Sequence, residues 1–142
     1  MKKVVKFGGS SLANAEQFQK VGDIIRSEES RRYVVPSAPG KRYAGDTKVT
    51  DLLYACYNKA EAEQDFSSIL TEIKERYYEI IRGLKLDLSL EEEFKKIEAD
   101  FAAHAGTEYA ASRGEFLNGK VMAAYLGYEF VDAATVIRFD KN

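Results

Sequence analysis

A lysine, two glycines and two serines follow one another closely near the start of the chain, in the sequence KVVKFGGSS at residues 3–11. The apolar residues of this segment favour a β-strand, and the glycines let the backbone turn without hindrance from a Cβ atom. Ser10 or Ser11 is a good N-cap for a helix that follows. A helix N-terminus offers free N–H groups and a partial positive charge, and Lys6 adds a full charge. The segment therefore predicts a phosphate-binding loop. The alternative is an ordinary strand-to-helix turn with no ligand.

The motif Lys6-Phe7-Gly8-Gly9-Ser10-Ser11 resembles the signature of aspartate kinases, which are members of the amino-acid kinase family. Its lysine precedes the glycines, whereas the lysine of a Walker A loop follows them. The resemblance implies that the lysine and the loop amides hold the phosphates of ATP during phosphoryl transfer to a carboxylate. The residues assigned to phosphate binding by this resemblance are Lys6, Phe7, Gly8, Gly9 and Ser10, with Lys6 as the catalytic residue.

Two further segments, VVPSA at residues 34–38 and VTDLL at residues 49–53, are similar to the two halves of a substrate-binding segment in aspartate kinases. The resemblance implies that Ser37 and Thr50 contact the aspartate substrate. The chain departs from the family pattern in two ways, because a proline precedes the serine and the connecting loop is longer and more basic. Thr47 therefore competes with Thr50 for this role. The alternative for either threonine is that it only caps the next helix.

The segment ASRGEFLNGK at residues 111–120 contains a Gly-Glu pair that is similar to the Ser-x-Gly-Glu segment of the same family. The resemblance implies that Glu115 holds the amino group of aspartate. An ammonium group needs an acceptor such as a carboxylate, which is best fixed on a rigid element. The alternative is structural, because Ser112 and Glu115 also have the spacing of a capping box at a helix N-terminus.

The elements that must position these motifs follow from hydrophobic spacing. Apolar residues at helical spacing predict a first helix over residues 12–27, and the β-rich run 33–35, closed by a proline, predicts a second strand. A strand, a helix and a strand in this order imply a parallel pair joined by a right-handed crossover, with ligands beyond the carboxyl ends of the strands. Two amphipathic helices are predicted as a hairpin over residues 64–105, ahead of a third strand at 128–131.

We therefore expect an α/β fold in which at least three mostly parallel strands carry helices on their faces. The resemblance makes this the three-layer α/β/α arrangement of amino-acid kinases with a helical hairpin insertion, and it assigns residues 1–142 to the N-terminal part of that domain. Complete aspartate kinases continue with more of the sheet. The chain is thus expected to be truncated, inactive alone, and prone to form homo-oligomers through the open sheet.

Composition limits the other possible functions. The 142 residues are 45% hydrophobic and 31% charged with a formal net charge of −2, which argues against a nucleic-acid or anionic-membrane surface. Neither a signal peptide nor a membrane span is recognisable, so a cytoplasmic protein is expected. Cys56 is the single cysteine and lies on the apolar stripe of a helix. It therefore predicts a buried thiol, with neither a disulfide nor a zinc site.

By resemblance, the expected activity is transfer of the γ-phosphoryl group of Mg·ATP to the β-carboxylate of L-aspartate. This gives 4-phospho-L-aspartate in the first step of lysine, threonine and methionine biosynthesis. ATP with Mg²⁺ and L-aspartate are the expected partners, and no protein-bound metal or organic cofactor is predicted.

Three alternatives remain open. One is another amino-acid kinase, acting on glutamate or an acylated glutamate, which should lack a carboxylate suited to a free α-amino group; Glu115 argues against it. The second is a non-catalytic module that binds aspartate or associates with itself. The third is an unrelated doubly wound protein in which the Gly-Gly-Ser turn occurs by chance.

Overall fold

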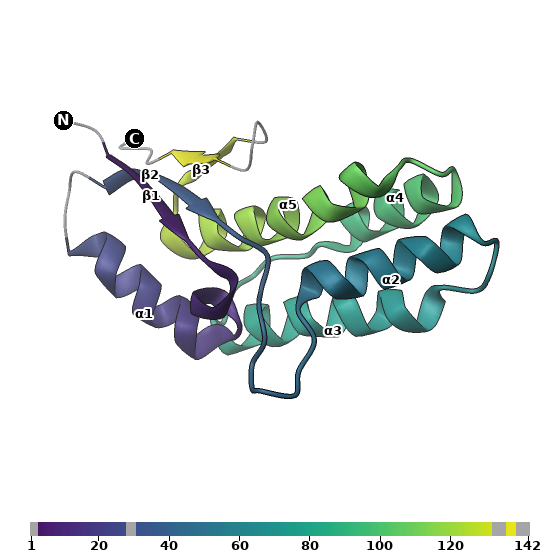
Figure 1. The fold of residues 1–142 in the computed structure, drawn as a ribbon. Helices are drawn as coiled ribbons and strands as arrows, with labels where there is room; N and C mark the ends of the chain where they lie inside the picture. Colours follow the sequence, from purple (N-terminus) through teal and green to yellow (C-terminus); the bar gives the residue numbers. More distant parts are fainter. Residues whose placement is uncertain (1–2, 28–30, 132–135, 139–142) are drawn as a thin grey trace.

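The computed structural model describes residues 3–27, 31–131 and 136–138. The elements in chain order are β1 (Lys3–Phe7), the 3-10 helix η1 (Gly9–Leu12), α1 (Ala15–Arg26), β2 (Arg31–Pro36), α2 (Val49–Glu61), α3 (Ser67–Gly83), α4 (Glu91–Ala102), α5 (Thr107–Leu126), β3 (Glu129–Val131) and β4 (Val136–Arg138). A small sheet lies at one end of the molecule, and helices α2 to α5 extend away from it (Figure 1). No helix within the described ranges is both long and apolar enough to cross a bilayer.

The sheet has the strand order β1-β2-β4-β3. Strands β1 and β2 are parallel, with Val5 opposite Val34 and Phe7 opposite Pro36, which confirms the predicted strand–helix–strand unit. Strand β4 is antiparallel to both β2 and β3. Strands β1, β2 and β3 therefore run in the same direction, and β4 is inserted between two of them in the opposite direction. The carboxyl ends of β1 and β2 lie at one edge of this α/β sheet.

The entry into the first helix differs from the prediction. Ser10 and Ser11 lie in η1, and α1 begins only at Ala15. The N-cap of α1 is Asn14, whose side chain accepts a hydrogen bond of 3.0 Å from the backbone N–H of Gln17. The prediction of a serine N-cap is therefore wrong. The reason is local, because the loop first closes a tight turn in which Ser11 N–H donates to the carbonyl of Gly8.

The residues predicted as a helical hairpin hold two helices, α3 and α4. Helix α3 packs mainly on α2, whereas α4 packs on α2 and α5. Aromatic side chains bridge the two helices, since the ring of Phe94 lies 6.2 Å from the rings of both Tyr77 and Tyr78. Cys56 is fully buried in α2, as predicted, and burial raises the pKa of its thiol to about 12. A thiol in this environment is unreactive.

One face of the sheet carries the helices. Val34 is fully buried in the core, and Phe130 packs against that core from the same face. Helices α1 and α5 touch each other there, where Arg26 Nη2 donates to the carbonyl of Tyr125 at 3.0 Å. On the opposite face Val4 is 69% exposed and Lys6 is exposed. Within the described residues, the helices thus cover one side of β1 and leave the other side open.

Candidate functional site

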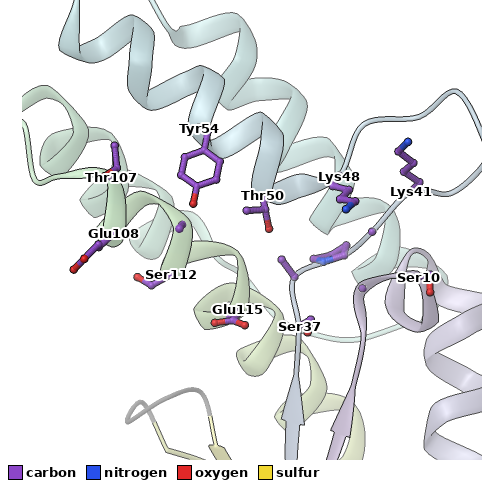
Figure 2. Close-up of a pocket in the computed structure, with 15 residues that line it drawn as sticks. Ser10, Ser37, Lys41, Lys48, Thr50, Tyr54, Thr107, Glu108, Ser112 and Glu115 are labelled. Atoms are coloured by element: carbon purple, nitrogen blue, oxygen red, sulfur yellow. The ribbon is translucent and has the colours of Figure 1, made fainter.

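A cleft of about 770 Å³ lies beyond the carboxyl ends of β1 and β2. Three walls enclose it: the loop after β1, the loop from β2 to the start of α2, and one face of α5 (Figure 2). Its lining residues are Gly9, Ser10, Ser37, Ala38, Pro39, Gly40, Lys41, Lys48, Thr50, Tyr54, Thr107, Glu108, Ala111, Ser112 and Glu115. This is the edge at which the parallel β1–β2 pair predicts a ligand site.

Five of the residues singled out from the sequence line this cleft together, namely Gly9, Ser10, Ser37, Thr50 and Glu115. The other three, Lys6, Phe7 and Gly8, are not among the lining residues. Phe7 is half-buried against the core, and its carbonyl accepts a hydrogen bond of 3.0 Å from Ser37 N–H. Phe7 thus helps to fix Ser37 through its backbone. Lys6 projects from the open face of β1, one residue before the strand ends.

Two glycines bring the loops after β1 and β2 into direct contact. Gly40 N–H donates to the carbonyl of Gly9 at 2.8 Å. A Cβ atom on Gly9 would lie 2.8 Å from the carbonyl oxygen of Ala38, and one on Gly40 would lie 2.7 Å from the carbonyl carbon of Gly9. Both contacts are with backbone atoms, which cannot move aside as a flexible side chain does. The close approach of the loops therefore requires glycine at both positions.

Replacing Gly40 with alanine is expected to force these loops apart. We expect a loss of roughly 1–3 kcal/mol in the free energy of unfolding, because a backbone clash in a packed region must be relieved by a shift of the chain. Gly45→Ala is the matched control in the same loop, since a Cβ there meets nothing within 4 Å. Urea denaturation of both variants measures the difference. Equal stabilities for the two would contradict the described contact.

Helix α5 begins at Thr107, two turns before Glu115, so Ser112 and Glu115 do not form a capping box at its N-terminus. The structural alternative for Glu115 is therefore wrong. Glu115 lies in the middle of a 20-residue helix and lines the cleft. Its neighbour Gly114 lets α5 approach the β2 loop, because a Cβ on Gly114 would lie 2.6 Å from the Cβ of Ala38.

Two buried polar side chains fix α5 against its surroundings. Tyr77 in α3 donates a hydrogen bond of 2.7 Å from its hydroxyl to the carbonyl of Gly114. Asn118, which is 0% exposed, donates from Nδ2 to the carbonyl of Ser37 at 2.7 Å. These bonds hold the helix segment that carries Glu115 next to the end of β2. No local pattern in the sequence marks either residue for this role.

Thr50 and Thr47 are also distinguished by the structure. The N-cap of α2 is Lys48, without a side-chain capping bond, so neither threonine caps the helix as the alternative required. Thr50 is in the first turn of α2 and lines the cleft, whereas Thr47 does not. The backbone of Thr47 is used instead, since its carbonyl accepts a hydrogen bond of 2.6 Å from Arg76.

Arg76 is the main anchor of the loop between β2 and α2. It is 4% exposed, and its guanidinium donates to the carbonyls of both Gly40 and Thr47, which stand at the two ends of the loop segment. Inside the segment, Arg42 makes a bidentate pair with Asp46 at 2.7 and 3.1 Å. The hydrogen bonds from Arg42 hold the pKa of the Asp46 carboxyl well below its usual range.

The role of Arg76 as a loop anchor was not predicted from the sequence. The signal was present, because an arginine stands on the buried stripe of α3 between Ile73 and Ile80. A charged residue on such a stripe is rarely buried without partners. The partners themselves are carbonyl groups about 30 residues away, which no spacing pattern reveals.

Five of the polar side chains that line the cleft differ from these anchors, because they have no polar partner within the described residues, whereas the hydroxyl of Ser112 donates to the carbonyl of Tyr109. Within the described residues, no hydrogen bond or ion pair engages the hydroxyls of Ser10 and Thr50, the ammonium groups of Lys41 and Lys48, or the carboxylate of Glu115. The cleft thus combines free donors, free acceptors and exposed loop backbone. Such a combination suits a small, highly charged ligand.

The chain is similar to known proteins of one family. The model of the amino acid kinase family matches residues 1–142. The chain is 42% identical over 140 residues to aspartokinase 3 of Bacillus subtilis strain 168, a match that covers 94% of this chain and 31% of that protein.

Solved structures give the same result. The structure of Clostridium acetobutylicum aspartate kinase matches with a TM-score of 0.88 and 45% identity, over 92% of this chain and 30% of that one. Escherichia coli aspartokinase III, solved in complex with aspartate and ADP, matches with a TM-score of 0.66 and 27% identity, over 89% of this chain and 29% of that one. The chain thus spans about a third of the length of these relatives. It belongs to the amino acid kinase family, and its resemblance to the N-terminal catalytic part of aspartate kinases is confirmed.

Proposed function

We propose that the chain forms the amino-acid-binding and phosphate-loop part of an aspartate kinase, which transfers the γ-phosphoryl group of Mg·ATP to the β-carboxylate of L-aspartate. The observation that carries the proposal is the uncommitted carboxylate of Glu115, which lines the same cleft as the Gly9–Ser10 loop. An amino acid with a free ammonium group and a phosphorylated nucleotide would satisfy both sides of this cleft. The relative from Escherichia coli was solved with aspartate and ADP.

The reaction needs no nucleophile from the protein. The β-carboxylate of aspartate is ionised at neutral pH, and one of its oxygens attacks the γ-phosphorus. A new P–O bond forms while the bond from the γ-phosphorus to the β–γ bridging oxygen breaks, and ADP leaves with that electron pair. Catalysis then depends on holding two anions in line and on neutralising the charge of the transferred group.

Six of the residues singled out from the sequence have a role in this scheme. Glu115 would accept hydrogen bonds from the α-ammonium group of aspartate, and the hydroxyls of Ser37 and Thr50 would donate to its carboxylates. The backbone N–H groups near Gly9 and Ser10 would bind phosphate oxygens. Lys6 would reach the phosphates from the end of β1, and Mg²⁺ would arrive with the nucleotide as part of the substrate complex.

The product, 4-phospho-L-aspartate, would enter lysine, threonine and methionine biosynthesis. A kinase for an acylated glutamate is the second candidate, because it would share the glycine loop. Glu115 favours the aspartate kinase, since a carboxylate facing an acylated nitrogen would find no positive charge to bind. Self-association of the chain remains a prediction that rests on the open sheet.

Calorimetry of the 142-residue chain with L-aspartate, N-acetyl-L-glutamate and Mg·ADP tests the substrate class. We expect L-aspartate to bind and N-acetyl-L-glutamate not to bind. Activity is tested in a chimera in which residues 1–142 replace the matching segment of the Bacillus subtilis relative, with the acyl phosphate trapped by hydroxylamine. A folded chimera that fails to phosphorylate aspartate, or prefers the acylated substrate, would contradict the proposal.

A further inference from the structure

The charged side chains around the cleft are divided between its walls. Helix α5 contributes two carboxylates, Glu108 and Glu115, and the loop before α2 contributes two ammonium groups, Lys41 and Lys48. Figure 2 shows both carboxylates on α5 and the lysines on the side of Ser10, with Glu115 nearer to the lysines and Glu108 pointing away from them. Glu115 and Lys48 therefore lie on different walls of the same cleft. A ligand with a cationic and an anionic end would fit in only one orientation.

Lys41 and Lys48 are the two charged side chains of the loop before α2 that no other charged group neutralises within the described residues. The other ionic groups neutralise one another, because Arg42 binds both Asp46 and Glu79 while Arg76 lies 3.6 Å from Asp46. Two arginines and two carboxylates leave this network with no net charge. Within the described residues, neither lysine has an ion-pair partner. Their charge is thus available to a ligand in the cleft.

The backbone of Lys48 is fixed on both sides. The carbonyl of Thr47 accepts from Arg76, and Val49 N–H donates to the carbonyl of Pro39 at 3.0 Å. Pro39 in turn precedes Gly40, which is bonded to Gly9. These bonds fix the backbone of Lys48 at a position between the glycine loop and Thr50, which lies two residues further along the chain. Figure 2 shows Lys48 between Thr50 and the loop residues near Ser10, whereas the ammonium group of Lys41 points away from Ser10.

We propose that Lys48 is a further catalytic residue, which binds the transferred phosphoryl group where the phosphate side and the amino-acid side of the cleft meet. This inference rests on the proposed function. In the step described above, the ammonium group of Lys48 donates hydrogen bonds to equatorial oxygens of the γ-phosphoryl group and neither gains nor loses a proton. It offsets the repulsion between that group and the attacking carboxylate, which is greatest in the transition state. Arg76 is a positioning residue, because it sets the loop from which Lys48 projects.

Kinetics of the chimera test this role. Lys48→Met is expected to lower kcat by about 10-fold to 100-fold, less than the loss of a fully buried donor because Lys48 is exposed to water. The KM for aspartate should change less than about threefold, since the charge acts mainly in the transition state. Lys48→Arg should recover part of the rate, and Lys41→Met should have a smaller effect than Lys48→Met. Lys59→Met is the matched control, because Lys59 is an exposed lysine in the last turn of α2, the helix whose N-cap is Lys48. It should leave kcat unchanged.

The outcomes separate the two proposals. If the unmodified chimera does not phosphorylate aspartate, the proposed function fails. If it does so and Lys48→Met keeps kcat within about twofold, the role of Lys48 is wrong while the proposed function stands. A raised KM for aspartate with unchanged kcat in Lys48→Met would also overturn the role of Lys48, because Lys48 would then bind the substrate without stabilising the transition state. Thermal unfolding of the 142-residue chain with each substitution checks that the fold is kept, and an exposed side chain without partners predicts no large change.

Discussion

Replacing Lys6 with alanine in the chimera is expected to lower kcat by roughly 100-fold to 1,000-fold, the usual loss for one preorganised donor to a transition state. Lys6 is exposed, and within the described residues its ammonium group has no partner, so no structural contact is lost with it. Its backbone pairing with Val35 is kept in the variant. The expected result is therefore an inactive protein with a nearly unchanged melting temperature. The hydroxamate assay and thermal unfolding measure the two quantities.

The matched control is Lys20→Ala, which removes another exposed lysine, on α1 and away from the cleft. It should leave both quantities unchanged. Near-normal turnover in Lys6→Ala would exclude the assigned role, since a lysine that contacts the γ-phosphate cannot be dispensable. A large drop in melting temperature would show instead that Lys6 serves the fold.

Replacing Glu115 with alanine is expected to weaken aspartate binding by about 10-fold to 100-fold, the range for loss of a hydrogen bond to a charged group. Binding of Mg·ADP should be unaffected, because Glu115 lies on the wall opposite Ser10. Helix α5 should remain intact, since Glu115 is exposed in its middle and alanine is a strong helix former. Calorimetry with each ligand gives the two dissociation constants separately.

Glu115→Gln refines this test by keeping the shape and removing the charge. It should lose most of the affinity that Glu115→Ala loses. Glu72→Ala, an exposed carboxylate on α3 away from the cleft, serves as the control. An unchanged affinity for aspartate in Glu115→Ala would mean that the ammonium group binds elsewhere, and Glu108 would be the next residue to test.

Much of the site could be predicted from the sequence because its parts are local. A strand that runs into Gly8 and Gly9 needs only the properties of neighbouring residues to be recognised. The parallel pairing of β1 and β2 then places the loops that follow them at one edge, which brings Ser10 and Ser37 to the same cleft. Topology thus converted separate motifs into one predicted site.

The features that the sequence left open depend on distant partners or on ambiguous spacing. Ser112 and Glu115 are three residues apart, and this spacing occurs in a capping box and in the middle of a helix alike. Only the true start of α5 at Thr107 decides between them. Asn118 and Arg76 act on carbonyl groups far along the chain, so their roles follow from the packing of α5 and α3 and from no local pattern.

The order of the strands in the sheet could not be predicted from the sequence either. Strands β3 and β4 contain three residues each, and their pairing depends on the sheet already formed by β1 and β2. Short strands have too few residues to show an alternating pattern. The reversed strand β4 between β2 and β3 was therefore visible only in the structure.

The hydrogen bond between Gly40 and Gly9 joins the two loops to which the proposed function assigns different substrates. Under the proposed function, one of these loops faces the phosphates and the other faces the amino acid, and the close glycine contact limits how far either loop can move without the other. We therefore expect that filling one side changes the free energy of filling the other. By thermodynamic linkage, nucleotide and amino acid must alter each other's dissociation constants by the same factor. Titration of each ligand in the presence of the other would measure this coupling.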